Sequence, residues 1–187
     1  TRPRALVPGL RYLSDMAIYA INDLEPTIHP DAYVHPDAVV IGSVTLGAGT
    51  SVWPSAVVRA DFGFVTVGEN TSIQDGAVIH CTAELPTRIG SHVTIGHLAH
   101  LEGCIVEDWA LIGVGSKVLH RAVVRSEALV GAGAVVTNDT EVPSLAMALG
   151  VPAVIKENRV QPDHLRSTSA GYVKNAQRYR SSLRRLD

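Results

Sequence analysis

Two histidines and a glutamate, His80, His97 and Glu102, have the types and spacing that could form a metal site. Imidazole nitrogens and one carboxylate form a ligand set of catalytic zinc, in which a fourth position stays open to water. Two more histidines, His100 and His120, follow in the same region. By spacing alone, solvated positions on a protein surface are the simpler interpretation. The choice therefore depends on the elements that must position these side chains.

Those elements are predicted by aliphatic residues that recur at every sixth position. A period of six fits neither a helix nor a strand with simple alternation. It is the hexapeptide signature of a parallel β-helix, so the predicted fold class is all-β. The repeat gives these inward positions: Ile28, Val34, Val40, Leu46, Val52, Val58; Val67, Ile73, Ile79, Ile89, Ile95, Leu101; Val106, Ile112, Val118, Val124, Val130, Val136, Val142.

Each hexad is expected to form one short strand and a corner, and three hexads make a triangular coil of about 18 residues. The aliphatic residue points inward and stacks on its equivalent one coil away, at about 4.8 Å. Glycine often follows it, as at Gly47 and Gly113, and is expected to permit the corner backbone. Two interruptions, residues 60–66 and 81–88, are expected to be loops outside the prism.

The repeat register predicts where the candidate ligands lie. His80 follows the inward Ile79, and Glu102 follows Leu101, the inward residue one coil later on the same face. The two side chains should therefore be neighbours, about one strand spacing apart. His97 is the third residue of its hexad and points away from this pair within one prism. In a trimer around a threefold axis, His97 of one subunit could meet His80 and Glu102 of the next.

Three segments are predicted: residues 1–25 as an N-terminal extension, 26–155 as the β-helix, and 156–187 as a tail with an amphipathic helix. Met16 resembles a natural start, so residues 1–15 are either native or an added upstream segment. From about Pro162 the period becomes helical. The helix should bury one apolar stripe along the prism or on a neighbouring subunit. The stripe consists of Leu165, Ser169, Tyr172, Ala176, Tyr179, Leu183 and Leu186.

Composition narrows the class of protein. Hydrophobic residues make up 46% of the 187 residues and aromatic residues only 5%, as expected for a narrow core of Val and Ile. The net charge of −2 gives no reason to expect a nucleic-acid or membrane partner. No transmembrane span or secretory signal is visible. The two cysteines, Cys81 and Cys104, form no disulfide framework, so a reducing cytoplasm is the expected location.

Several motifs in this order and spacing resemble the γ-class carbonic anhydrase family. The resemblance covers residues 26–155, and the helical tail resembles that of the bacterial branch. It implies a left-handed β-helix followed by a C-terminal α-helix, a homotrimer, and three zinc sites at the subunit interfaces. The motifs are Arg59-Ala-Asp61, Gln74-Asp75-Gly76, Ile79-His80, Gly96-His97 and the stretch Leu101-Glu102-Gly103-Cys104.

The family holds its metal with three histidines, and this chain matches two of them, His80 and His97. Glu102 occupies the third position. Glu102 is expected to bind the metal in place of histidine; the alternatives are that His100 supplies the third nitrogen or that no metal binds tightly. The implied metal is Zn²⁺, with Fe²⁺ or Co²⁺ as alternatives. A carboxylate ligand would make the bound water less acidic.

Further roles follow from the resemblance. Arg59 matches an arginine that pairs across the interface with Asp75 or Asp61. Gln74 matches a residue that hydrogen-bonds the metal-bound water or the substrate. Tyr172 resembles a tail tyrosine that reaches the site in some members, and the alternative is packing within the helical stripe.

The function implied is reversible hydration of CO2 by a metal-bound hydroxide. Phe62 lies near the position of the archetype's proton-shuttle carboxylate, so activity is expected to be weak or absent. The alternatives are metal-dependent hydrolysis of a small ester, such as a coenzyme A thioester, and a non-catalytic trimeric binding or scaffold protein. The small-molecule substrate is therefore CO2 or bicarbonate, or a small ester.

Overall fold

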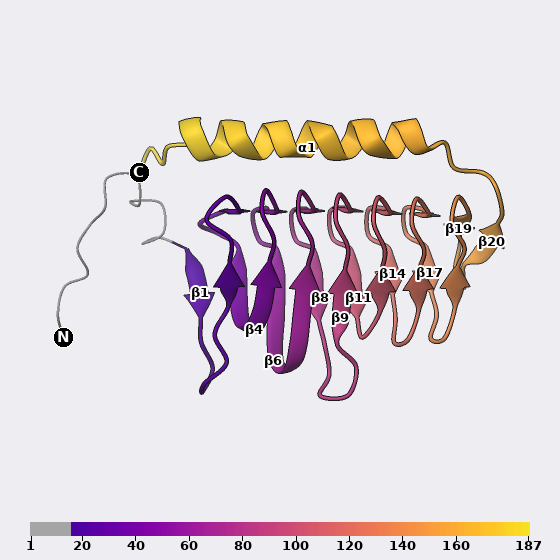
Figure 1. Ribbon diagram of the computed structural model, residues 1–187, viewed down its shortest axis with the longest axis horizontal. Coiled ribbons are helices and arrows are strands. Elements are labelled where there is room, and N and C mark those ends of the chain that lie inside the picture. The colour runs from indigo at the N-terminus through magenta and orange to yellow at the C-terminus, as the bar shows by residue number, and fades with distance from the viewer. Residues whose placement is uncertain (1–15) are drawn as a thin grey trace.

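The hexapeptide repeat folds as predicted into a three-sided parallel β-helix with one long α-helix along its side (Figure 1). The computed structural model describes residues 16–187. Strands stack in register from coil to coil, so that Ile73 pairs with Ile95 and Ile95 with Ile112. Each face of the prism is therefore a ladder of equivalent hexad positions.

Two faces of the prism belong to one 12-stranded sheet. The first face contains β1 (Ala17–Tyr19), the N-terminal halves of β4 (Val39–Leu46) and β6 (Val57–Val67), β8 (Val78–His80), β11 (His100–Glu102), β14 (Lys117–Val118) and β17 (Val135–Val136). The second face contains β2 (Thr27–Ile28), the C-terminal halves of β4 and β6, β9 (Thr87–Ile89), β12 (Ile105–Val106), β15 (Val123–Val124) and β18 (Glu141–Val142).

The third face is a separate 8-stranded sheet. Its last pair is antiparallel, because β20 turns back onto β19 and ends the β-helix. The strands are β3 (Tyr33–Val34), β5 (Ser51–Val52), β7 (Ser72–Ile73), β10 (Thr94–Ile95), β13 (Leu111–Ile112), β16 (Leu129–Val130), β19 (Met147–Leu149) and β20 (Val154–Lys156).

The first interruption of the repeat is a strand, not the loop expected for residues 60–66. These residues belong to β6, which continues around the corner from the first face to the second and pairs with β4 on both. The extra length is absorbed by a register shift between Gly42 and Val44. The second interruption does leave the ladder at residues 81–86, and β9 resumes it at Thr87.

The prism interior is filled by the predicted aliphatic stack. From Val34 onward these side chains are at most 3% exposed. Small corner residues such as Ala77 and Ala99 are equally buried. Cys81 and Cys104 are free and belong to this core. Loss of even one methylene from such packing is costly.

The glycines that follow the inward residue are required for a different reason from the one predicted. Gly68 and Gly113 do not have a positive φ; a Cβ on either would lie 2.6 Å from backbone atoms of the next coil. The left-handed conformation occurs instead at corner residues such as Leu98 and Arg121. These glycines therefore permit close stacking of coils rather than an unusual dihedral angle.

Part of the expected N-terminal extension belongs to the sheet. β1 pairs in parallel with β4, with Ala17 opposite Val39. Residues 1–15, which are either native or an added upstream segment, lie outside the described residues.

The C-terminal helix, α1 (Pro162–Ser182), begins at the predicted proline and lies along the third face (Figure 1). Its stripe is buried against the chain's own prism, with Leu165 2% exposed and Ala176 5% exposed. Leu183 and Leu186 lie beyond the helix end and are exposed. Within residues 16–187, no helix combines the length and hydropathy needed to span a bilayer.

Aromatic side chains fasten α1 to the early coils. Tyr179 packs edge-on to Trp53, with ring centroids 5.1 Å apart, and Tyr172 contacts the same ring at 6.1 Å. Tyr33 completes the cluster. Trp53 donates a hydrogen bond from its indole nitrogen to Ser72 at 2.9 Å, so its polar atom is satisfied while its ring is buried.

Replacing Gly113 with alanine should lower the free energy of unfolding by about 2 kcal/mol or more, because the new Cβ overlaps the neighbouring coil. The matched control is Gly171→Ala in α1, where an added Cβ has no atom within 4 Å. That change should stabilise the protein by about 0.5–1 kcal/mol through helix propensity. Thermal unfolding at one protein concentration measures both; equal effects would contradict the close-stacking explanation.

Stability should fall in acid partly through Glu107. A hydrogen bond from Arg125 is the main cause that holds the pKa of Glu107 below its ordinary 4.5, against the effect of burial. A carboxylate with a lowered folded-state pKa stabilises the fold above its unfolded pKa and loses that contribution as pH falls through the folded value. Glu107→Gln should therefore lose less stability than wild type between pH 7 and pH 3, measured by denaturant unfolding. If wild type and Glu107→Gln lose the same stability over this pH range, Glu107 makes no such contribution.

Candidate functional site

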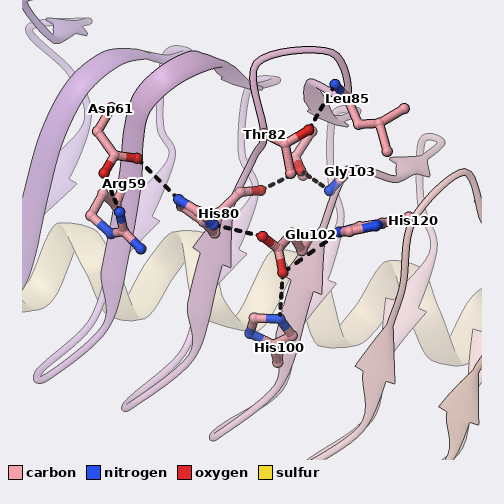
Figure 2. A network of polar contacts seen from close by, with 10 residues as sticks. Arg59, Asp61, His80, Thr82, Leu85, His100, Glu102, Gly103 and His120 are labelled. Carbon is pink, nitrogen blue, oxygen red and sulfur yellow. Dashed lines mark hydrogen bonds and ion pairs between the residues drawn. The ribbon is translucent and has the colours of Figure 1, made fainter.

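His80 and Glu102 are neighbours, as the repeat register predicts. The two residues pair across β8 and β11, and His80 Nδ1 lies 2.7 Å from Glu102 Oε1 (Figure 2). Both side chains stand at the C-terminal ends of their strands, where the first face meets the corner. Each is mostly buried, which strengthens their electrostatic interaction.

The second ring nitrogen of His80 contacts another carboxylate. Nε2 lies 3.0 Å from Asp61 Oδ1, and Arg59 pairs with the other oxygen of Asp61 (Figure 2). Both ring nitrogens of His80 therefore face a carboxylate oxygen. Arg59 pairs with Asp61 of its own chain. The resemblance implies a pairing across a subunit interface instead. We call Arg59, Asp61, His80 and Glu102 the first half-site.

Two further histidines meet the free oxygen of Glu102. His100 Nε2 lies 3.5 Å from Oε2 and His120 Nε2 lies 3.7 Å from it (Figure 2). The sequence provided one indication that His120 lies near Glu102, because His120 falls one coil above Gly103 in the repeat. It did not predict that both rings would converge on the same carboxylate, because this depends on side-chain conformation.

The carboxylates of the first half-site are held ionised. Burial opposes ionisation of Glu102, but the hydrogen bond from His80 and the nearby His80, His120 and His100 keep its pKa below its ordinary value. Burial likewise opposes ionisation of Asp61, and hydrogen bonds from His80, its own backbone and Arg59 lower its pKa. Two anionic groups on either side of one imidazole favour the binding of a cation.

The loop after His80 is fixed to the half-site by backbone contacts. The Thr87 hydroxyl donates to the carbonyl of His80 and accepts the amide hydrogen of Gly103 at 2.8 Å. Within the loop, the amide of Leu85 donates to the Thr82 hydroxyl at 3.1 Å (Figure 2). These contacts connect the loop to the strand ends that carry His80 and Glu102.

We call the remaining predicted residues the second half-site: Gln74, Asp75, His97 and Tyr172. His97 Nδ1 lies 2.8 Å from Asp75 Oδ2. Gln74, adjacent to Asp75, is only 4% exposed. Burial and the charge of Asp75 raise the pKa of Tyr172, so the tail tyrosine lies near this group while it also packs on Trp53.

The two half-sites lie at opposite ends of the same strands. Asp75 and His97 precede β8 and β11, whereas His80 and Glu102 end them. A corner with a left-handed residue, Gly76 or Leu98, separates the two groups along each stretch of chain. In agreement, residues 16–187 contain no group of three His, Cys, Asp or Glu side chains placed to hold a metal ion within one chain.

The donor set of the first half-site fits two ligands of a metal ion. His80 keeps its Nε2 on Asp61, an arrangement that orients ligating histidines, and its Nδ1 faces the Glu102 carboxylate. His80 and Glu102 would offer such an ion one imidazole nitrogen and one carboxylate oxygen. His97 has the chemistry of a third ligand but belongs to the second half-site, and His100, the alternative third nitrogen, lies 3.5 Å from Glu102 Oε2.

An exposed apolar side chain borders each half-site. Phe62, next to Asp61, is 73% exposed, and Leu98, next to His97, is 68% exposed. Large apolar side chains exposed beside polar groups are typical of interaction or ligand-binding surfaces.

Comparison with known proteins identifies relatives of the whole β-helix. The profile of the family Bacterial transferase hexapeptide (six repeats) matches residues 25–60. The mitochondrial γ-carbonic anhydrase 2 of Arabidopsis thaliana is 36% identical over 84% of this chain, and γ-carbonic anhydrase 1 is 42% identical over 71%. The chain spans only 59% and 50% of those two plant proteins. The carnitine operon protein CaiE of Escherichia coli is 37% identical over 80% of this chain and 76% of its own length.

Solved structures confirm the fold. A hexapeptide transferase family protein from Anaplasma phagocytophilum has a TM-score of 0.83 and 30% identity, covering 89% of this chain and 99% of its own. A putative acetyltransferase from Bacillus cereus has a TM-score of 0.87 and 28% identity over 89% and 98% of the two chains. The left-handed β-helix predicted from the resemblance is therefore confirmed. Together with its relatives among the γ-carbonic anhydrases and CaiE, this shows that the chain belongs to the γ-carbonic-anhydrase-like family of hexapeptide-repeat proteins.

Proposed function

We propose that the protein is a metal-dependent carbonic anhydrase that hydrates CO2 reversibly at sites shared between the subunits of a homotrimer. The observation that carries the proposal is the division of the predicted site into two half-sites at opposite strand ends. One prism cannot use both halves together. A threefold assembly joins the first half-site of each subunit to the second half-site of its neighbour and forms three equal sites.

His80 and Glu102 of one subunit and His97 of the neighbouring subunit would hold the metal ion. When bound, Zn²⁺, or Fe²⁺ or Co²⁺ in its place, supplies a Lewis acid that lowers the pKa of water toward neutrality. Because Glu102 adds negative charge, this activation is weaker than it would be with a third histidine.

The remaining residues orient the ligands, bind the substrate and carry the released proton. Asp61 accepts a hydrogen bond from His80 Nε2 and fixes the ring, while Arg59 neutralises part of the charge of Asp61. Gln74 can hydrogen-bond the attacking water or the bicarbonate oxygen from the second half-site. His100 and His120, each about one-third exposed, connect Glu102 to solvent and can carry the released proton at Nε2.

Hydrolysis of a small thioester at the same site is the second candidate. It is favoured by Phe62, whose exposed ring next to Asp61 gives an apolar surface for an acyl group. A coenzyme A complex among the solved structures also favours an acyl substrate: PerB from Caulobacter crescentus, solved with coenzyme A and GDP-perosamine, has a TM-score of 0.52 and 31% identity over 71% of this chain and 57% of its own. A panel of coenzyme A thioesters, assayed beside CO2 hydration, separates the two activities.

Metal analysis of the native assembly tests the shared site. Elemental analysis of protein purified without chelators or metal-affinity resin should find about one ion per chain, in a trimer by light scattering. His97→Ala should lose most of the metal because it removes one of three ligands. The control His164→Ala, at an exposed histidine of α1, should retain it. A wild-type trimer without metal after reconstitution would support the non-catalytic alternative instead.

The role of Glu102 is tested by two substitutions. Glu102→His should bind metal more tightly and hydrate CO2 faster, because a neutral ligand leaves more positive charge to polarise water. Glu102→Gln should lower the metal content, since it retains shape but loses charge. Stopped-flow CO2 hydration and metal content provide the measurements. If Glu102→His loads no more metal and stays inactive, the assignment of Glu102 as a ligand is wrong.

A further inference from the structure

A shallow cavity of about 230 Å³ lies on the second face, just around the corner from the first half-site. Gly103, the residue after Glu102, forms part of its wall. The other walls are apolar and two arginines border them. The lining residues are Leu85, Pro86, Ile105 and Ala122, with Arg88 and Arg121.

Arg88 is held in place without a counter-charge. Its guanidinium lies over the ring of Phe64, with 4.5 Å to the centroid, and this contact restricts its orientation. No carboxylate of residues 16–187 lies within ion-pair distance of it, in contrast to Arg125 on the same face, which pairs with Glu107 and Glu141. A fixed, uncompensated guanidinium at the edge of a cavity is a binding group for an anion.

Arg121 adds a second guanidinium to the lining, although Asp139 compensates its charge. Asp139 engages its Nε at 2.6 Å and its Nη2 at 2.9 Å, which leaves Nη1 for a ligand. The hollow on the other side of Arg88 and Ile105 contains Glu107 and Asp108. An anion is therefore attracted to the cavity between the arginines and repelled from its neighbour.

We propose that this cavity binds a small organic acid, with its carboxylate on Arg88 and its apolar part on Leu85, Ile105 and Ala122. The volume suits a single ring, because a protein cavity of about 150 Å³ accommodates benzene. The arginines select the carboxylate, and the apolar walls select an organic anion over an inorganic one. The binding site needs neither a bound metal nor turnover of CO2.

Titration with sodium benzoate tests the proposal on the full chain. Isothermal titration calorimetry should detect one benzoate per chain, and the uncharged isostere benzamide should bind about tenfold more weakly or worse. Arg88→Gln should reduce benzoate affinity by a similar factor. Arg125→Gln, the matched control on the same face, should leave it unchanged because that guanidinium is occupied by two carboxylates. Circular dichroism verifies that both variants are folded.

Two further measurements separate this cavity from the metal site. Benzoate should bind equally to protein with and without chelator treatment, and Ile105→Glu should abolish binding by placing a negative charge in the apolar wall. The proposal is overturned if benzoate binds no better than benzamide, if Arg88→Gln has no effect, or if binding vanishes with the metal. Equal binding of inorganic phosphate would also overturn it, since the apolar walls would then contribute nothing. None of these results depends on whether the protein hydrates CO2.

Discussion

The vertical register of the coils is the constraint on which the rest of the structure depends. Each inward aliphatic residue packs on its equivalents above and below, and the parallel ladder pairs every hexad position with the same position of the next coil. A shift by one residue would turn the whole stack outward. The glycines that follow Leu46, Val67 and Ile112 bring the coils close enough for this packing, since any Cβ there would meet backbone.

The register also determines the chemistry of the surface. Positions one coil apart become neighbours, so His80 lies beside Glu102, while Asp61, two residues after the ladder position of Arg59, reaches the other ring nitrogen of His80 through its side chain. The same geometry keeps the two half-sites apart, since a strand has two ends and a rigid prism cannot fold one onto the other.

The sequence predicted the features that follow from periodicity alone. The stacking of His80 on Glu102, the start of the helix at Pro162 and the buried stripe through Tyr179 all follow from counting residues. The features it missed depend on local three-dimensional detail. β6 continues through residues 60–66 because Ala60 and residues 65–66 pair with β4 on either side of a register shift, and Arg59 pairs with Asp61 because the two side chains share one face. The convergence of His100 and His120 on Glu102 depends on side-chain rotation, which periodicity does not constrain.

The return of α1 over the third face links the end of the chain to its beginning. Coils can form one after another as the polypeptide leaves the ribosome, because each new coil pairs with the one before it. Trp53 and Tyr33, however, remain uncovered until α1 has been made and Tyr179 packs on them. A helix that follows all the coils in the chain thus covers the aromatic surface of the earliest coils. A chain released too early would expose that surface, and chaperones and proteases could recognise it as incomplete.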